Sequence, residues 1–155
     1  MTQQSQPAAQ LRAPDALALA YRLVQHRANQ AGIRVIFVKG MVANHHRTRP
    51  IRNSADEDVL VEPHRYQDFI SLLAGDEWIE RPKTLIKQTW PCDIGVHQFF
   101  PGFLAEPAGV FELLWARRDT LQVAHQSCGG TDFISTILIQ GLHSIRSSSS
   151  GPPRC

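Results

Sequence analysis

The sequence has 155 residues, of which 43% are hydrophobic and 19% are charged, a composition typical of a globular protein that can build its own core. The net charge of +2, with histidines neutral, is too small to indicate binding to nucleic acid or to an anionic membrane. No apolar run approaches the length of a membrane span. The three cysteines are odd in number and show no CxxC spacing, so we expect a cytoplasmic protein without a disulfide framework.

We expect one domain over residues 14–146, between a disordered lead-in over 1–13 and a disordered Ser/Pro-rich tail over 147–155. Hydrophobic periodicity and turn residues predict the elements of this domain. They are a helix from Pro14 to about Gly32, a strand over 33–39, a short helix over 41–46, a strand over 55–61, a helix over 63–74, strands over 84–90 and 92–100, a helix over 108–118, a short strand over 120–125, and a helix over 131–146 with Thr131 as its N-cap. This order predicts an α+β domain with a small mixed β-sheet flanked by helices.

Three consecutive carboxylates, Asp56, Glu57 and Asp58, stand directly before the apolar run 59–61. Because side chains alternate along a strand, Asp56 and Asp58 share one face, about 6–7 Å apart. Two charges at this separation repel by roughly 2.5 kcal/mol at an effective dielectric constant of 20. A divalent cation removes this repulsion, and Mg²⁺ is the natural candidate because it prefers hard oxygen ligands. Glu57 points the other way, and we expect it to be an exposed strand residue and not a ligand.

A third carboxylate for this site is expected on a later strand, and Asp93 is the candidate. Two metal ions held by three carboxylates are the arrangement for in-line phosphoryl chemistry, in which Asp93 is also a possible proton acceptor. Before the acidic strand, Gly40 would let the backbone approach a phosphate closely, and Lys39 would offer it a positive charge. Further phosphate contacts are expected from the arginines of the loop between these two motifs, Arg47, Arg49 and Arg52.

The order of these motifs resembles that of a poorly characterised bacterial nucleotidyltransferase-like family of the DNA polymerase β superfamily. The motifs are "VKG" at the end of a strand, a short helix, a basic loop, "RNSADEDVLV", a helix and a later strand with an acid, and the similarity covers about residues 15–146. The resemblance implies a nucleotidyltransferase fold in which Asp56, Asp58 and Asp93 are the catalytic, metal-binding residues. It also implies Mg²⁺, as two ions, and a nucleoside triphosphate as donor, with pyrophosphate as product and an acceptor that the family does not define. The nucleotide-binding residues would be Lys39, Gly40, Arg52 and Ser54.

Three departures from the family pattern leave a second hypothesis open. Glu57 stands where the family has an apolar residue, Gly95 occupies a slot where histidine is common, and the sequence reaches "SSSSGPPRC" where the family continues with helices. These departures favour a catalytically degenerate or truncated copy that acts as a binding or interaction module, such as an antitoxin-like partner of a second protein. A zinc site is a further alternative, although its candidate ligands lack a known spacing. Those candidates are His45, His46, Cys92 and His97.

Overall fold

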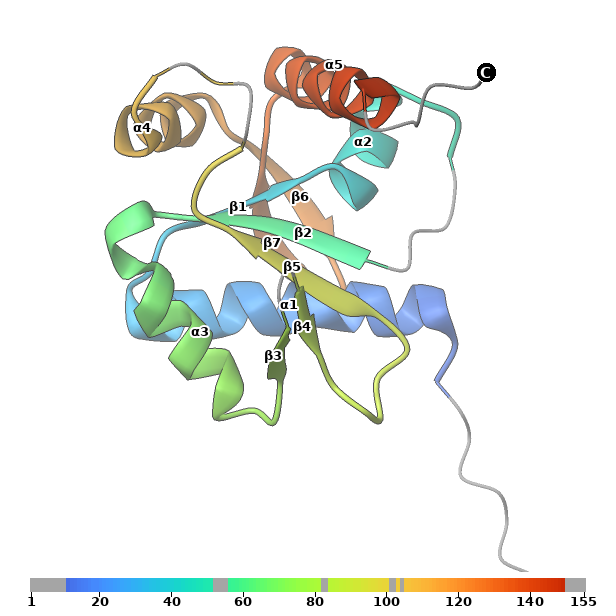
Figure 1. Cartoon of the computed structure of the whole chain (residues 1–155). Coiled ribbons are helices and arrows are strands. Elements are labelled where there is room, and N and C mark those ends of the chain that lie inside the picture. Colours follow the sequence, from blue (N-terminus) through green and yellow to red (C-terminus); the bar gives the residue numbers. More distant parts are fainter. Residues whose placement is uncertain (1–10, 52–55, 82–83, 101–102, 104, 150–155) are drawn as a thin grey trace, which may run out of the picture.

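The computed structural model describes residues 11–51, 56–81, 84–100, 103 and 105–149. In this part of the chain, a seven-stranded mixed sheet of order β3-β4-β5-β2-β1-β7-β6 is covered by helices (Figure 1). The strands are β1 (Val35–Val38), β2 (Asp56–Val61), β3 (Ile79–Arg81), β4 (Thr84–Ile86), β5 (Asp93–His97), β6 (Asp119–Val123) and β7 (Gln126–Gly130). The helices are α1 (Ala13–Ala31), α2 (Gly40–His46), the 3₁₀ turn η1 (Pro63–Arg65), α3 (Tyr66–Ala74), α4 (Pro107–Arg117) and α5 (Phe133–Ser149).

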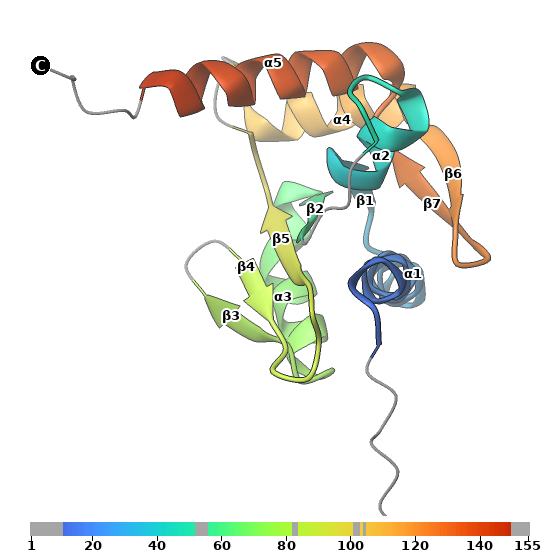
Figure 2. The ribbon, with the colours of Figure 1, turned by 90° about the vertical axis from the view of Figure 1, so that its right-hand side faces the viewer.

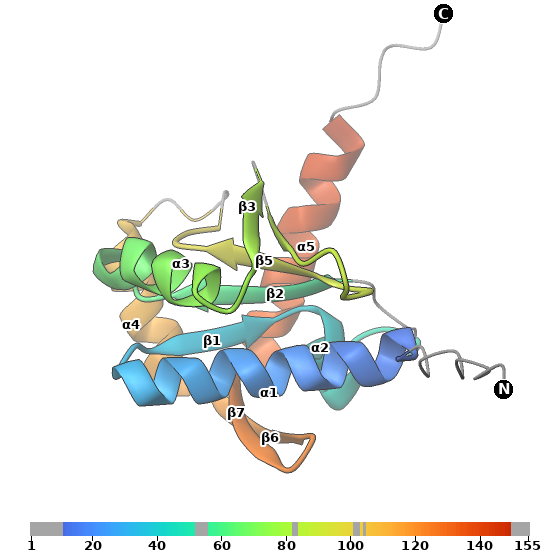
Figure 3. The same cartoon turned by 90° about the horizontal axis from the view of Figure 1, so that it is seen from below.

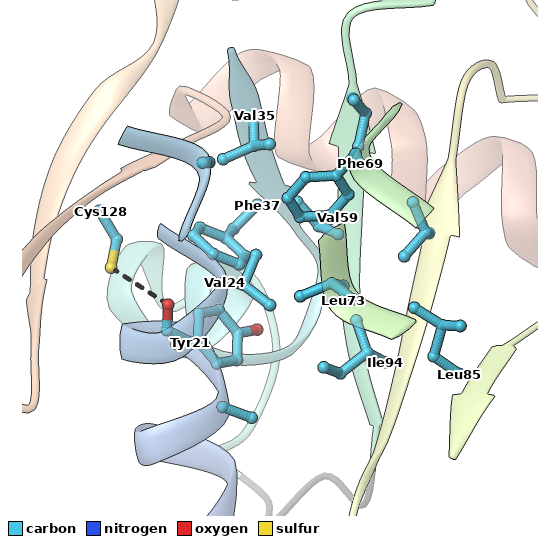
Figure 4. Packing of buried hydrophobic residues seen from close by; sticks show 14 of the residues in the cluster. Tyr21, Val24, Val35, Phe37, Val59, Phe69, Leu73, Leu85, Ile94 and Cys128 are labelled. Carbon is cyan, nitrogen blue, oxygen red and sulfur yellow. Dashed lines mark hydrogen bonds between the residues drawn. The ribbon is translucent and has the colours of Figure 1, made fainter. Parts of the chain in front are cut away.

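The two faces of the sheet are covered differently. Helices α1 and α3 lie on one face, and α4 and α5 lie on the opposite side (Figures 2 and 3). Below, the α1 face means the side of the central strands that carries Phe37, Glu57 and Val59, and the α5 face means the side that carries Asp58 and Leu60. The α1 face holds the larger core, in which strand and helix side chains interdigitate (Figure 4). A smaller apolar cluster on the α5 face lies under α4 and consists of Ile36, Leu60, Val110, Phe111 and Leu114.

The register of the central strands determines which side chains meet. Strand β1 pairs antiparallel with β2 and parallel with β7. Strand β2 also pairs parallel with β5, and this pairing sets Asp56 opposite Asp93 and Asp58 opposite Gly95. Because β2 and β5 run in the same direction, their acidic amino-terminal ends lie at the same edge of the sheet.

The fold class predicted from the sequence, an α+β domain with a mixed sheet flanked by helices, is confirmed. The strand expected over 84–90 ends at Ile86, because the chain turns where the Trp90 N–H donates to the Lys87 carbonyl at 2.8 Å. The strand expected over 92–100 ends at His97. Strands β3 and β7 were not predicted from the sequence.

The last helix differs from its prediction at both ends. Thr131 is not its N-cap, because the carboxylate of Asp132 accepts the N–H of Ser135 at 2.8 Å. Thr131 is buried instead, with its hydroxyl 2.8 Å from that of Thr136. Helix α5 continues to Ser149, beyond the predicted end at residue 146.

The described residues also show the length of the helices and the burial of two cysteines. No helix among them is long and apolar enough to cross a membrane. Cys92 and Cys128 are buried free thiols, and burial raises the pKa of each to about 12. Cys92 is therefore poorly suited to act as a nucleophile.

Candidate active site

The three aspartates singled out in the sequence lie on the α5 face at the amino ends of two adjacent strands. Asp56 and Asp93 are directly paired across β2 and β5, and both are exposed. Asp58 lies two residues further along β2, and its side chain is 20% exposed. Two of these carboxylates thus face solvent, and the third lies deeper at the sheet.

Asp58 is held by two basic side chains. One of its oxygens lies 2.8 Å from His97 Nε2, and the other lies 3.6 Å from Lys39 Nζ. Burial opposes ionisation of Asp58, but the hydrogen bond to His97 and the charge of Lys39 outweigh it, so that the pKa of Asp58 lies below its ordinary value. Asp58 is therefore a carboxylate at neutral pH.

The carboxylates do not converge on one point. Among the described residues, no group of three or more His, Cys, Asp and Glu side chains could hold a metal ion as placed. The zinc alternative gains no support for the same reason. The donor set still fits magnesium, because it offers carboxylate oxygens on one sheet face, two of them from directly opposed residues.

Gly95 makes room for the contact between Asp58 and His97. A Cβ atom at Gly95 would lie 2.7 Å from Asp58 Oδ1 and 3.2 Å from His97 Nε2. A side chain at this position would push the ends of Asp58 and His97 aside, so glycine leaves the room in which the two groups meet over this strand. The departure from the family pattern at Gly95 is therefore linked to the position of His97.

The Lys39-Gly40 turn between β1 and α2 has an unusual backbone. Lys39 has φ 58° and ψ −148°, a region that is almost restricted to glycine, and Gly40 has φ 40°. The hydroxyl of buried Tyr21 lies under this turn, where it accepts the N–H of Met41 at 3.3 Å. Because a Cβ at Gly40 would come within 2.7 Å of that hydroxyl, glycine is required there. Strain of this kind is typical of functional sites, where the surrounding structure imposes it.

Glu57 is not exposed, contrary to the prediction. It is fully buried on the α1 face, and neither carboxylate oxygen has a hydrogen-bond partner among the described residues. Burial, followed by the charge of Asp58, raises the pKa of Glu57 well above its ordinary value and so favours the protonated form of this carboxyl group. The prediction failed because β2 is a central strand and α1 covers the face toward which Glu57 points.

Two predicted nucleotide-binding residues, Arg52 and Ser54, lie outside the described residues. Of the other loop arginines, Arg49 approaches the site, since its guanidinium donates to the Gly40 carbonyl at 3.4 Å.

The sequence did not reveal the role of His97 or of the aromatic residue beside it. The rings of His97 and Phe100 lie 4.9 Å apart, and the ammonium of Lys39 lies 5.6 Å from the centre of the Phe100 ring. Alternation along the strand could have placed His97 at the site, because residues 93, 95 and 97 of one strand share a face.

Comparison with solved structures identifies the fold. The antibiotic-resistance factor ANT(2'')-Ia in solution aligns over 87% of this chain and 76% of its own, with a TM-score of 0.56 and 9% identity. Its crystal structure in complex with adenylyl-2''-tobramycin aligns over 87% and 80%, with a TM-score of 0.56 and 9% identity. TM1012 of Thermotoga maritima, provisionally described as a nucleotidyltransferase, aligns over 85% and 88%, with a TM-score of 0.58 and 9% identity.

No protein-family model matches the sequence, and no curated protein is significantly similar to it. The structural likeness therefore shows the fold: the chain has a nucleotidyltransferase fold, with a mixed sheet flanked by helices. At 9% identity, this likeness concerns the fold and not the reaction.

Proposed function

We propose that the protein is a Mg²⁺-dependent nucleotidyltransferase that transfers a nucleotidyl group from a nucleoside triphosphate to an acceptor and releases pyrophosphate. The observation that carries this proposal is the register of β2 and β5, which pairs Asp56 with Asp93 and leaves Asp58 on the same face. The nucleotidyltransferase fold of the chain supports it, and so does the adenylylated small molecule in the complex of one structural neighbour.

Asp56, Asp58 and Asp93 would hold the magnesium, which supplies neutralisation of the charge on the phosphates. Lys39 would bind phosphate oxygens, because its ammonium already lies at the site, and the backbone at Gly40 is proposed as a further phosphate contact from its place beside Lys39. Arg52 and Ser54 are proposed as further nucleotide contacts from their place in the sequence.

In the proposed reaction an acceptor oxygen attacks the α-phosphorus of the triphosphate. The bond from the α-phosphorus to its bridging oxygen breaks, and pyrophosphate leaves with the electron pair. Asp93 would take the acceptor proton, since it is exposed and lies beside Asp56. His97 would orient Asp58 through the hydrogen bond between them.

Ligand-dependent thermal stability tests the site. A ligand that binds only the folded state raises the melting temperature, so Mg²⁺ with ATP or GTP should raise it more than Mg²⁺ alone. The double variant Asp56→Asn/Asp58→Asn should lose this additional rise. An equal shift in wild type and double variant would mean that the site is assigned to the wrong residues.

Turnover tests the reaction. Pyrophosphate release from the purified chain, with a panel of hydroxyl-bearing acceptors, should depend on Mg²⁺ and be lost in the same double variant. Nucleotide binding without turnover across the panel, together with tight binding of a protein partner, would support the interaction module instead.

A further inference from the structure

Helix α5 lies at the periphery of the molecule and turns its more apolar side outward (Figures 1 and 2). Its inward side buries Ser135, Thr136 and Ile139, two of which are polar. Its outward side carries five large apolar side chains that are each between 44% and 69% exposed: Phe133, Ile134, Ile137, Leu138 and Ile145. Below, the outer face of α5 means these five residues together with Gly141, which is also exposed. Because a surface helix normally buries its apolar side, this arrangement predicts that something covers the outer face.

The outer face carries no charge. Residues 133–145 include no Asp, Glu, Lys or Arg. A charged surface would lose hydration on this face without gaining an ion pair, so the face fits an uncharged, apolar partner. Helices that lie on membranes usually carry Lys and Arg beside their apolar side, and residues 133–145 lack them. A second copy of the same face meets the requirement, because it is equally apolar and brings no like charges together.

The spacing of the residues makes the outer face complementary to itself. Ile134, Leu138, Gly141 and Ile145 follow one another at intervals of four, three and four residues, the spacing of a stripe that packs along a second helix. In an antiparallel pair of α5 helices, the register that sets Leu138 opposite Gly141 of the second copy also sets Ile134 opposite Ile145. One register therefore matches all four positions across a two-fold axis, as an isologous interface requires.

Gly141 lies near the middle of the outer face, since successive helical residues are rotated by about 100°. A Cβ atom at Gly141 would have no neighbour within 4 Å among the described atoms. Glycine destabilises the interior of a helix relative to alanine, and no contact in the described part of the chain requires glycine here. A second helix that approaches closely does require it, because the missing side chain leaves room for Leu138 of the other copy.

The outer face is large enough to form the centre of a dimer interface. Five large side chains that are each about half exposed amount to on the order of a few hundred Å² of apolar surface. This area is comparable with the largest apolar patch on a typical monomer, roughly 300–600 Å², which is often a functional surface. In a standard interface each partner buries roughly 800 Å², with a polar rim around an apolar centre of this kind.

We propose that the outer face of α5 is an interface between two copies of this chain, which pack α5 against α5 in antiparallel orientation. The two-fold axis passes between Leu138 and Gly141, so each leucine packs over the glycine of the other copy. The inference goes beyond the proposed function and does not depend on it, because the three aspartates lie on strands β2 and β5 and no residue of the outer face belongs to the candidate active site.

Sedimentation equilibrium of the full chain tests the association, and we expect a reversible monomer–dimer equilibrium between about 1 and 100 μM. Leu138→Glu places a charge beside the two-fold axis in both copies and should raise the dissociation constant at least about 30-fold. The matched control is Leu113→Glu on α4, which replaces a leucine of nearly equal exposure, 58% against 55%, and should leave the dissociation constant unchanged. Circular dichroism establishes that both variants are folded.

Gly141→Ala separates dimerisation from the stability of the helix itself. The added methyl group holds the two helices apart, so the dissociation constant should rise about tenfold. The melting temperature of the dilute monomer should rise at the same time, because alanine favours the helix. An unrelated surface position would show the second effect without the first.

Cysteine cross-linking tests the register. In a Cys155→Ser background, the remaining native cysteines are buried. Mild oxidation should link Ile134→Cys/Ile145→Cys into a covalent dimer, whereas Ile134→Cys alone should stay monomeric under denaturing conditions. Both variants carry a cysteine on the same exposed face, so the single variant controls for non-specific oxidation.

Three results would overturn the proposal. They are a monomer at all concentrations, an equal dissociation constant for Leu138→Glu and wild type, and covalent dimers of Ile134→Cys alone, which would indicate parallel helices. A chain that stays monomeric but binds phosphatidylcholine vesicles, with loss of binding in Leu138→Glu, would assign the outer face to a lipid surface. These measurements involve neither nucleotide nor Mg²⁺, so their failure is separate from failure of the proposed function.

Discussion

The two faces of strand β2 place the same kind of group in opposite environments. On the α5 face, Asp58 is half-buried, hydrogen-bonded to His97 and paired with Lys39. On the α1 face, the adjacent Glu57 is fully buried without a hydrogen-bond partner among the described residues. The pKa of Asp58 is lowered and that of Glu57 is raised, so one face favours the ionised form of a carboxyl group and the other face favours the protonated form. The protonation of each acid in this run of three therefore depends on the face of the sheet on which it lies, and not on the presence of acidic neighbours in the sequence.

The largest expected difference between the faces is in activity. Asp58→Asn removes a carboxylate from the proposed magnesium site and should lower the rate of nucleotidyl transfer by on the order of 10²–10³-fold. Glu57→Gln makes the same chemical change one residue away, but on the opposite face of the sheet and at a carboxyl group whose neutral form is favoured by burial, and should change the rate by less than about threefold. Steady-state assays of pyrophosphate release compare the two. Equal losses would show that the faces are not functionally distinct.

The pH dependence of stability should differ between wild type and Glu57→Gln. An unfolded glutamate loses its proton near pH 4.3, whereas folded Glu57 keeps its proton to higher pH because its pKa is raised. Wild type should therefore lose about 1.4 kcal/mol of stability per pH unit, relative to the glutamine variant, from about pH 5 up to the folded pKa. Asp58 acts in the opposite sense only below about pH 4, since its pKa is lowered. Urea denaturation at several pH values measures this slope, and parallel curves for the two proteins would contradict the prediction.

The backbone of Lys39 predicts an unusual order of stabilities. Lys39→Gly should be more stable than Lys39→Ala by about 1–3 kcal/mol, because glycine alone adopts φ 58° and ψ −148° without strain. Both variants should lose activity with the ammonium group. At the exposed position His26 in the middle of α1, alanine should instead be favoured over glycine by about 1 kcal/mol. Chemical denaturation measures the free energy of unfolding of the four variants. A more stable alanine variant at both positions would show that the backbone of Lys39 is not strained.

Two glycines, one on each face, allow a direct comparison in which the expected effects are the smallest. A Cβ at Gly130 would lie 2.7 Å from Leu121 Cδ2 and 3.0 Å from Val42 Cγ2, so Gly130→Ala should cost about 1–3 kcal/mol of stability through overpacking, with little change in activity. Gly95→Ala displaces the movable ends of Asp58 and His97, and should instead cost about tenfold in activity with a smaller loss of stability. Melting curves and rates for both variants test this, and a larger stability loss at Gly95 would reverse the assignment.

The sequence allowed prediction of the parts of the site that depend on alternation and on strand length. The apolar runs of β1 and β2 predicted buried strands, and the spacing of Asp56 and Asp58 predicted their common face. Pairing of Asp93 with Asp56 agrees with the expectation of a third acid on an adjacent strand.

Other features depend on contacts that no local pattern records. Strand β7 reads "QSCGG", with no β-branched residue, and becomes a strand because β1 and β6 pair with its two edges. The burial of Glu57 depends on which face α1 covers, and alternation alone does not distinguish the faces.

The position of β1 also has a consequence for how the chain folds during synthesis. One edge of β1 pairs with β2, which follows soon after it, but the other pairs with β7 through Phe37 and Gly130. Until β7 has left the ribosome, that second edge of an apolar strand stays open to pairing with other chains. Closure of the sheet is therefore a late, long-range event that is slowed by the intervening chain, and nascent chains that stop before β7 should depend most on chaperones.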